Sequence, residues 1–325
     1  MNAALSLSLC MIVRDEEACL GRCLNSVAEL APEIIVVDTG SNDRSVDIAK
    51  EFGAKVWQFD WTGDFAQARN VSLAHAVGDW VLWLDADEEL APEAGRAIAA
   101  LIATTDADGI KVTVRSHNPP GETTLYDDGT ITRLFRRRAG VRFEGAIHEQ
   151  VGPSIVRLGG RIDSAPEIVI LHHGYATSVA QGQDRARRNL RTLEAAVQKH
   201  PDDAYLRFHL GATCQAAGDA TRAEAELLRA IESNRGELSQ TLSALAYCKL
   251  AQLALARRDD AAATDRARLA LALDGHNAVA LQVLGVALAQ CGDLKGAKTA
   301  FVALIQEPRV TGEVRAFAER LVKAL

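Results

Sequence analysis

The chain has 325 residues, 48% apolar and 5% aromatic, which is enough for two domains of about 150 residues each and excludes a small disulfide-stapled domain. Asp and Glu number 43 against 36 Lys and Arg, and the net charge of −7 argues against nucleic acid as a partner. The six cysteines form no Cys-x-x-Cys pair, which argues against structural zinc and indicates a reducing compartment.

No segment of the sequence has the pattern of a leader or a membrane anchor. Residues 1–13 carry no basic stretch before their apolar run, and the charged segment Arg14–Glu17 follows at once. No later apolar run approaches the roughly 18 residues needed to cross a bilayer. We therefore expect a cytoplasmic protein with no transmembrane segment.

The first 175 or so residues alternate short β-rich runs with helical stretches. The predicted strands are Leu5–Val13, Ile34–Val37, Ala54–Phe59 and Trp80–Leu84. The predicted helices are residues 16–30, 43–52, 64–77 and 92–104. This order predicts an α/β, Rossmann-like domain with a mostly parallel sheet. Ligands of such sheets bind beyond the carboxyl ends of the strands, so one crevice should collect Arg14–Glu17, Asp38–Asp43 and Asp85–Glu88.

From about residue 183 the strand pattern stops, alanine dominates, and apolar residues recur at helical spacing. Three similar phrases begin at Leu210-Gly211, Leu250-Ala251 and Leu284-Gly285, spaced by 40 and then 34 residues, and the second spacing is the tetratricopeptide period. Alanines predicted where paired helices cross are Ala223, Ala230, Ala263, Ala270 and Ala297. We therefore predict domains at 1–182 and 183–325, the second all-α, with a bulge in the longer first linker; an alanine-rich bundle without repeats is the alternative.

The strongest local pattern is Trp80–Glu89, in which an apolar run leads into two carboxylates, Asp85 and Asp87. On an extended chain these side chains point the same way, and their repulsion favours a divalent cation such as Mg²⁺ or Mn²⁺. A solvated turn that caps the next helix is the alternative.

Two further segments point to the same crevice. Asp38 ends an apolar run and could accept hydrogen bonds from an imide or a ribose hydroxyl, while Ser41 or Asp43 could simply cap the next helix. Arg69 lies one turn into a predicted helix and could pair with a pyrophosphate through a bidentate fork.

Taken together, four ordered motifs resemble the family-two glycosyltransferases of the GT-A fold over about residues 5–175: Met11–Glu17, Ile35–Asp43, Phe65–Asn70 and Leu84–Glu88. The chain looks most similar to the bacterial branch in which tetratricopeptide-type helices follow the catalytic domain. That branch includes peptide S-glycosyltransferases, and the chain is also similar to lipopolysaccharide-core β-glucosyltransferases. Arg14-Asp15 departs from the Tyr-Asn or Lys-Asn of many relatives, which affects how the base is recognised.

The resemblance implies roles position by position. The backbone near Val13, with Glu16 and Asp38, would hold the nucleoside, and Arg69 would face the diphosphate. Asp85 would contact ribose or metal, and Asp87 would bind the metal. These roles imply a nucleotide-sugar donor and Mn²⁺ or Mg²⁺ as cofactor.

Two later phrases complete the expected site. Phe143–Glu149 places His148 and Glu149 after a predicted strand, and Glu149 is the candidate catalytic base; its alternative role is to hold His148 or an arginine of the run Arg133–Arg138. His172 is the expected nitrogen ligand of Mn²⁺, with His173 as the alternative. The basic run Arg133–Arg138 either forms an exposed hairpin or attracts an anionic ligand.

We therefore predict a cytoplasmic, metal-dependent, inverting glycosyltransferase. The resemblance favours a UDP-sugar donor ahead of GDP-mannose, and the helical repeats favour a peptide or protein acceptor, because a solenoid groove suits an extended chain. Two alternatives remain open: a lipopolysaccharide or other glycan as acceptor, and a scaffold that binds nucleotide sugar without turnover. A sugar-nucleotide pyrophosphorylase would normally have a glycine-rich, basic phosphate loop after its first strand, and Arg14–Glu17 is not such a loop. The repeats could also mediate a homodimer.

Overall fold

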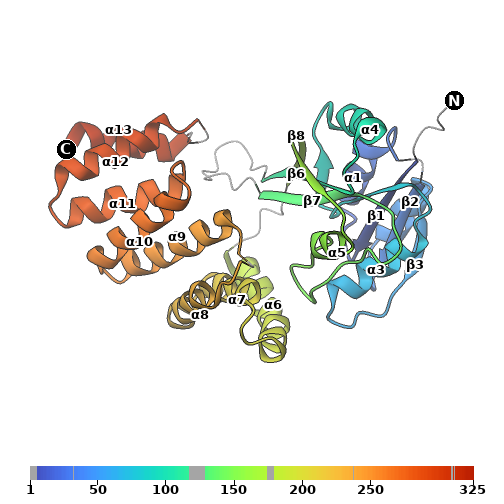
Figure 1. Cartoon of the computed structure of the whole chain (residues 1–325), viewed down its shortest axis with the longest axis horizontal. Coiled ribbons are helices and arrows are strands. Elements are labelled where there is room, and N and C mark those ends of the chain that lie inside the picture. The colour runs from blue at the N-terminus through green and yellow to red at the C-terminus, as the bar shows by residue number, and fades with distance from the viewer. Residues whose placement is uncertain are drawn as a thin grey trace. The chain divides into compact units, whose positions relative to one another are not determined.

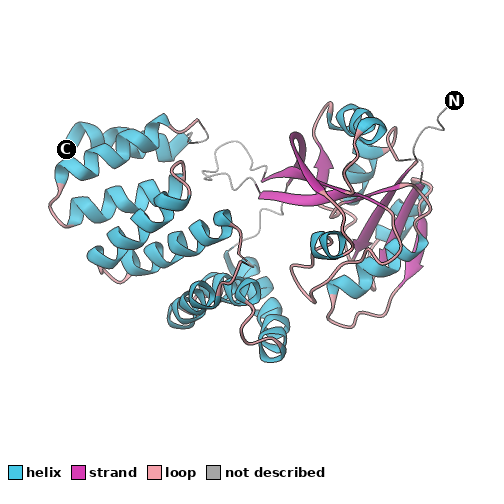
Figure 2. Ribbon diagram, viewed as in Figure 1, coloured by secondary structure: helices cyan, strands magenta, loops and turns pink. Residues whose placement is uncertain are grey.

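The computed structural model describes these residues: 6–31, 33–116, 129–173, 179–236, 238–308, 310 and 312–325. It divides into two compact units, one containing the described strands with α1–α5 and the other containing α6–α13 (Figures 1 and 2). An α/β domain followed by a run of helices confirms the predicted fold class. The predicted domain boundary after residue 182 lies inside α6 (Val179–Lys199), whereas the two units divide after Ala176.

The first half of the sheet is parallel and has the predicted order of strands and helices. Its neighbouring strands are β3 (Lys55–Gln58), β2 (Glu33–Asp38), β1 (Leu7–Val13) and β4 (Trp80–Trp83). The helices that alternate with them or follow them are α1 (Leu20–Val27), α2 (Ser45–Glu51), α3 (Phe65–His75) and α4 (Ala94–Thr104). Each predicted element of this half is confirmed.

The second half of the sheet is mixed and was not predicted. It adds β7 (Gly129–Arg136), β6 (Gly109–Ser116), β8 (Ile162–His172) and β5 (Glu88–Leu90) beyond β4, in that order. β7 is antiparallel to β4 and β6, while β6 is parallel to β8. β5 pairs antiparallel with β8 and sets Glu88 opposite His172, which brings the end of β8 to the turn after β4.

Alternating side chains of β1 pack into different layers on the two faces of the sheet. Leu9 and Met11 join the core that includes residues of α1 and α4, whereas Cys10 joins the core formed with α3 and α5 (Gly152–Arg157). Burying a leucine or methionine side chain contributes about 1.5–3 kcal/mol. The helices thus hold the parallel strands from both sides and fix the edge where their carboxyl ends meet.

The second unit repeats one helical hairpin three times. Its helices after α6 are α7 (Ala204–Ala216), α8 (Ala220–Ser233), α9 (Gln240–Ala256), α10 (Asp260–Leu273), α11 (Ala278–Gln290), α12 (Leu294–Gln306) and α13 (Gly312–Ala324). The helices from α7 to α12 each begin with a side chain that accepts a backbone N–H three residues on: Asp203, Asp219, Ser239, Asp259, Asn277 and Asp293. Such caps contribute about 1 kcal/mol each.

None of the described helices combines the length and the apolar composition that a membrane-spanning helix needs.

Small residues let the paired helices approach closely. A Cβ added at Gly211 would lie 2.7 Å from Leu227, and one added at Gly285 would lie 2.7 Å from Phe301. The five alanines predicted at helix crossings are fully buried. The small residues that recur along the sequence therefore lie where the helices contact each other, as predicted.

The longer first repeat differs from the predicted bulge. α9 has 17 residues where α7 and α11 have 13, so four of the six extra residues form about one additional turn of helix. The other two lengthen the linker before α9. Helix extension costs less than a larger loop because each added residue gains a backbone hydrogen bond.

Arg258 offers a direct test of the repeat. Its φ of +64° occupies the position at which the other two repeats have Gly218 (φ +89°) and Gly292 (φ +84°). A side chain in the left-handed region is strained, so Arg258→Gly should raise the free energy of unfolding of the helical unit by about 1 kcal/mol. Denaturant unfolding followed by circular dichroism measures this change. The control Gly218→Ala should lower the stability, and two shifts of the same sign would contradict the argument.

Candidate active site

The carboxyl ends of β1 and β2 lie side by side and present Asp38. Val13 pairs with Asp38 in the parallel register, and the Val13 carbonyl accepts the Thr39 N–H at 2.9 Å. The buried Asp38 carboxylate accepts the N–H groups of Gly40 and Ser41 at 3.2–3.3 Å. The turn after β2 therefore fixes the Asp38 carboxylate at the edge of the sheet, where a nucleoside was predicted to bind.

The loop after β1, which contains Glu16, is held by the loop after β2. Three consecutive backbone N–H groups, of residues 15–17, donate at 2.7–3.0 Å to Ser41 Oγ, Ser45 Oγ and Asp43 Oδ2. The Asn42 N–H donates in return to Asp15 at 2.7 Å. Asp43 also accepts the N–H of Ser45, the first residue of α2, but the N-cap residue of this helix is Arg44, whose side chain makes no cap; Ser41 binds the first loop instead.

Asp85 and Asp87 lie in a tight turn between β4 and β5, not on the extended chain that we predicted. The Glu88 N–H donates to the Asp85 carbonyl at 3.1 Å, and Glu88 Oε2 accepts the Asp85 N–H at 2.8 Å. Because of this turn the two aspartates have different partners. The Asp85 carboxylate faces arginines, and the Asp87 carboxylate faces a histidine.

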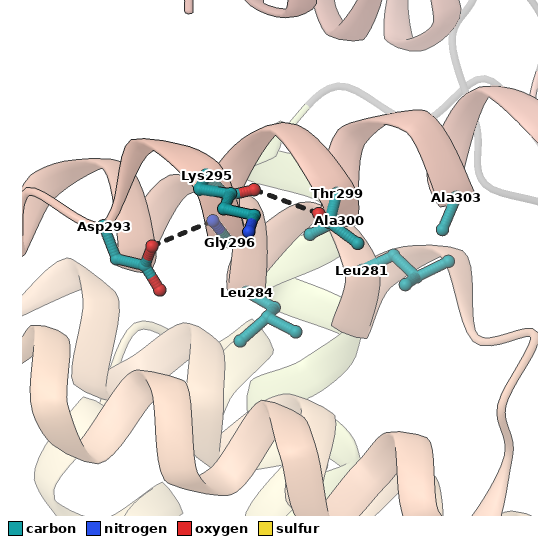
Figure 3. Close-up of a pocket in the computed structure, with 8 residues that line it drawn as sticks. All are labelled: Leu281, Leu284, Asp293, Lys295, Gly296, Thr299, Ala300 and Ala303. Carbon is teal, nitrogen blue, oxygen red and sulfur yellow. Dashed lines mark hydrogen bonds between the residues drawn. The ribbon is translucent and has the colours of Figure 1, made fainter.

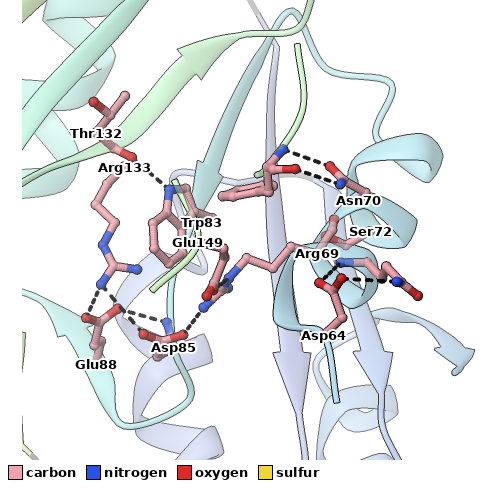
Figure 4. A network of polar contacts seen from close by, with 12 residues as sticks. Asp64, Arg69, Asn70, Ser72, Trp83, Asp85, Glu88, Thr132, Arg133 and Glu149 are labelled. Carbon is pink, nitrogen blue, oxygen red and sulfur yellow. Dashed lines mark hydrogen bonds and ion pairs between the residues drawn. The ribbon is translucent and has the colours of Figure 1, made fainter. Parts of the chain in front are cut away.

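Arg69 joins Asp85 to Glu149 (Figure 4). Its Nη2 lies 2.5 Å from Asp85 Oδ1, and its Nε donates to Glu149 Oε1. The side chain is only 5% exposed, and its guanidinium stacks on Trp83 at 4.1 Å. Glu149 thus holds Arg69, a partner that the sequence analysis did not consider.

A second arginine reaches the same carboxylate from β7. Arg133 is 4% exposed, its Nη2 lies 2.6 Å from Glu88 Oε1 and 3.6 Å from Asp85 Oδ2, and its guanidinium stacks on Trp83 at 3.5 Å. Trp83 lies between the two arginines in Figure 4 and donates its indole N–H to the Thr132 carbonyl at 2.8 Å. The predicted exposed hairpin is wrong for Arg133.

The electrostatics of the cluster split its two carboxyl groups. Burial raises the pKa of Asp85, but the charges of Arg69 and Arg133 outweigh burial and lower this pKa to about 2. Burial raises the pKa of Glu88 to about 7, against the opposing charge of Arg133. Asp85 is therefore held as a carboxylate. For Glu88 the cost of burying the charged form is larger than the gain from Arg133, so the protonated form is favoured.

Asp87 and His172 form the candidate cation site. His172 Nε2 lies 3.2 Å from Asp87 Oδ2, and this hydrogen bond raises the pKa of His172. His173 instead lies 2.9 Å from Glu89. One oxygen and one nitrogen donor at this separation fit a single Mn²⁺ or Mg²⁺ ion. Within the described parts of the chain, no group of three or more such ligands gathers, so the protein would supply a partial set.

Glu149 belongs to an irregular segment after β7 rather than to a strand end as predicted. The segment is tied to α3, because the Asn70 side chain exchanges two hydrogen bonds with the Phe143 backbone at 2.8–3.0 Å and the Phe65 N–H donates to the Ala146 carbonyl at 2.8 Å. The start of α3 therefore positions Glu149 beside Arg69.

Sequence analysis missed Trp83 and Glu88 as site residues and took Arg133 only as part of a basic run. The burial of Arg133 could have been predicted, because side chains two residues apart on a strand share a face and Phe135 is fully buried. A charged residue on a buried face requires a partner, and the nearby acidic turn supplies it. For Trp83 no pattern separates a core tryptophan from a spacer between two cations.

Residues 8–157 match the family model described as Glycosyl transferase family 2. A TPR repeat-containing protein of Synechococcus elongatus is 40% identical over 280 residues, covering 83% of this chain and 67% of that protein. The glycosyltransferase SunS of Bacillus subtilis is 29% identical over 203 residues, covering 62% of this chain but 47% of SunS. A crystal structure of TarS residues 1–349 from S. aureus is 17% identical, covers 91% of this chain and 90% of that one, and has a TM-score of 0.44.

The chain belongs to glycosyl transferase family 2. The resemblance inferred from the four ordered motifs is thus confirmed. The chain spans about half the length of SunS and two thirds of the Synechococcus protein.

The raised pKa of Glu88 predicts a pH dependence of stability. Between pH 4.5 and 7 the folded state holds a proton that the unfolded carboxyl has already released, so stability falls as pH rises through this window. Replacing Glu88 by Gln removes this decline, which amounts to roughly 2–3 kcal/mol. Unfolding by urea at pH 5 and pH 7.5 measures it. Parallel pH curves for the wild type and Glu88→Gln would contradict the assignment.

Proposed function

We propose that this chain is an inverting, metal-dependent glycosyltransferase that moves a sugar from a UDP-sugar to a peptide or protein. Membership of family 2 supports the reaction class. The observation that carries the proposal is the gathering of Asp38, Asp85 and Asp87 at the carboxyl ends of β2 and β4, the edge at which open α/β sheets bind ligands.

The proposed donor site follows the predicted roles. Val13, Glu16 and Asp38 would hold the nucleoside, and Asp85, ionised and oriented, would accept hydrogen bonds from the ribose hydroxyls. Arg69 Nη1 is buried and has no acceptor among the described residues. A diphosphate oxygen is the kind of acceptor that this N–H lacks.

Asp87 and His172 would hold Mn²⁺ or Mg²⁺, with the diphosphate of the donor completing the coordination. A cation there would neutralise charge that develops on the departing nucleotide. The oxygen and nitrogen donors 3.2 Å apart support this assignment, and His173, which contacts Glu89, is the weaker candidate.

Glu149 has two candidate roles. As a base it would take the proton of the acceptor nucleophile, and as a partner of Arg69 it would hold that guanidinium in place. The ion pair with Arg69 supports the second role and keeps Glu149 within reach of the proposed diphosphate position. We keep the base as the working assignment, because Arg69 occupies only one oxygen of the Glu149 carboxyl group and the other oxygen can accept a proton.

A peptide or protein is the proposed acceptor, supported by resemblance to the branch with helical repeats and by the repeats themselves. One pocket of the helical unit is lined by α11 and α12 residues that combine apolar side chains with Asp293 and Lys295 (Figure 3). A lipopolysaccharide or other glycan is the second candidate acceptor. Six free cysteines support a reducing, cytoplasmic location, and a homodimer through the helices stays a prediction.

The central test combines donors, acceptors and the cation. We expect the purified chain to release UDP from a UDP-sugar in the presence of Mn²⁺, with transfer to peptides when peptides and lipid-linked sugars are offered separately. Asp87→Asn should lose at least about 100-fold in activity, since one neutralised metal ligand weakens cation binding strongly. Full activity of Asp87→Asn in the presence of a chelator would refute metal dependence, and transfer only to lipid-linked sugars would refute the peptide acceptor.

Glu149→Gln separates the two roles of Glu149. If Glu149 is the base, transfer should fall by about 100-fold or more, well beyond any loss of UDP affinity that the weakened ion pair with Arg69 causes. If it only holds Arg69, UDP affinity and transfer should fall together. Transfer is measured by product formation and affinity by calorimetry, and near wild-type transfer would end the assignment of Glu149 as the base.

A further inference from the structure

Arg133 is an arginine that the proposed function does not use, although it is almost completely buried. It comes from the middle of β7, at the junction where the parallel half of the sheet meets its antiparallel neighbour. Its guanidinium contacts three groups, Glu88, Asp85 and the face of Trp83. These partners belong to the end of β4, to the turn after it and to the first residue of β5, so the buried cation constrains that turn.

The two arginines hold the two oxygens of one carboxylate. Arg69 faces Asp85 Oδ1 at 2.5 Å and Arg133 faces Asp85 Oδ2 at 3.6 Å, and both guanidiniums stack on Trp83 (Figure 4). Arg69 donates a hydrogen bond to one oxygen and Arg133 forms a longer ion pair with the other, so a quarter turn about the Cβ–Cγ bond would weaken both contacts. Trp83 keeps the two like charges apart while attracting each of them through its ring.

From this arrangement we propose that Arg133 is a positioning residue for donor binding: it fixes the orientation of the Asp85 carboxylate and thereby sets the affinity for the nucleoside diphosphate. The inference rests on the proposed function, because it takes Asp85 as a group that contacts the donor. Arg133 itself touches no reacting atom in this scheme. Its effect therefore belongs to binding of the donor and not to the chemical step.

The charge balance explains why Arg69 cannot do this alone. Three carboxylates, Asp85, Glu88 and Glu149, share two guanidiniums. Without Arg133, the buried Glu88 loses its ion-pair partner, and Asp85 keeps only the contact from Arg69. Arg133 reaches both carboxyl groups through the single atom Nη2, while its planar guanidinium stacks on Trp83. A lysine retains the charge but lacks the flat group that stacks on the ring.

The test compares Arg133→Lys with a matched control on the same strand. Arg136 stacks on Trp80 at 4.7 Å and donates to the carbonyls of Thr105 and Ala107, so Arg136→Lys removes an equivalent stacked arginine away from the site.

We expect Arg133→Lys to raise both the KM for the UDP-sugar and the Kd for UDP by about tenfold. The kcat should change less than threefold, because only the positioning of the donor in the ground state is lost. Arg136→Lys should leave all three values unchanged. Near-ultraviolet circular dichroism of the ligand-free proteins should report the altered surroundings of Trp83 in Arg133→Lys.

Each outcome decides the inference. Wild-type KM and Kd in Arg133→Lys, or a fall in kcat with KM unchanged, would overturn it. If Arg133→Lys does not fold, a double variant with Arg133→Met and Glu88→Gln removes both partners of the buried ion pair, and its control is Glu88→Gln alone. Weaker UDP affinity in the double variant than in the control supports the inference. Equal UDP affinity in the double variant and the control would overturn it. A wild-type chain that binds no UDP would overturn the proposed function together with the inference, whereas normal UDP binding by both wild type and Arg133→Lys would overturn the inference alone.

Discussion

One carboxylate, that of Asp85, organises the site, because two buried arginines hold its two oxygens across a single tryptophan. Buried charges are tolerated only when paired, and this pairing is arranged among β4, β7 and α3. These contacts lower the pKa of Asp85 and keep it ionised, whereas burial raises the pKa of Glu88. The acidic turn can thus remain rigid and negatively charged at the edge of the sheet.

The topology of the sheet makes this possible. Parallel strands bring the ends of β1, β2 and β4 to one edge, and the antiparallel β7 then delivers Arg133 beside the last of them. β5 pairs with β8 directly after the acidic turn and places His172 next to Asp87. The parallel half of the sheet therefore contributes Asp38, Asp85 and Asp87, whereas Arg69 comes from α3 and Arg133 and His172 come from the mixed half.

The helical unit is stabilised by contacts that recur from one helical hairpin to the next. Glycine or alanine at each crossing permits close packing, and a polar cap begins each helix from α7 to α12. The helices of neighbouring hairpins pack against each other and share buried cores. An added helical turn in α9 is accommodated because it extends the stack at a helix end without changing the crossing.

The sequence by itself determined the parallel strands, the helical repeats, the family and the acidic residues at the strand ends, because these features depend on local periodicity and on residues close together in the chain. Only the tertiary structure decided which partner each carboxylate takes. Glu149 meets Arg69 across 80 residues, and Arg133 meets Glu88 across 45. The pairing of Arg133 depends on β7 running antiparallel beside β4, a long-range strand pairing that local periodicity does not encode.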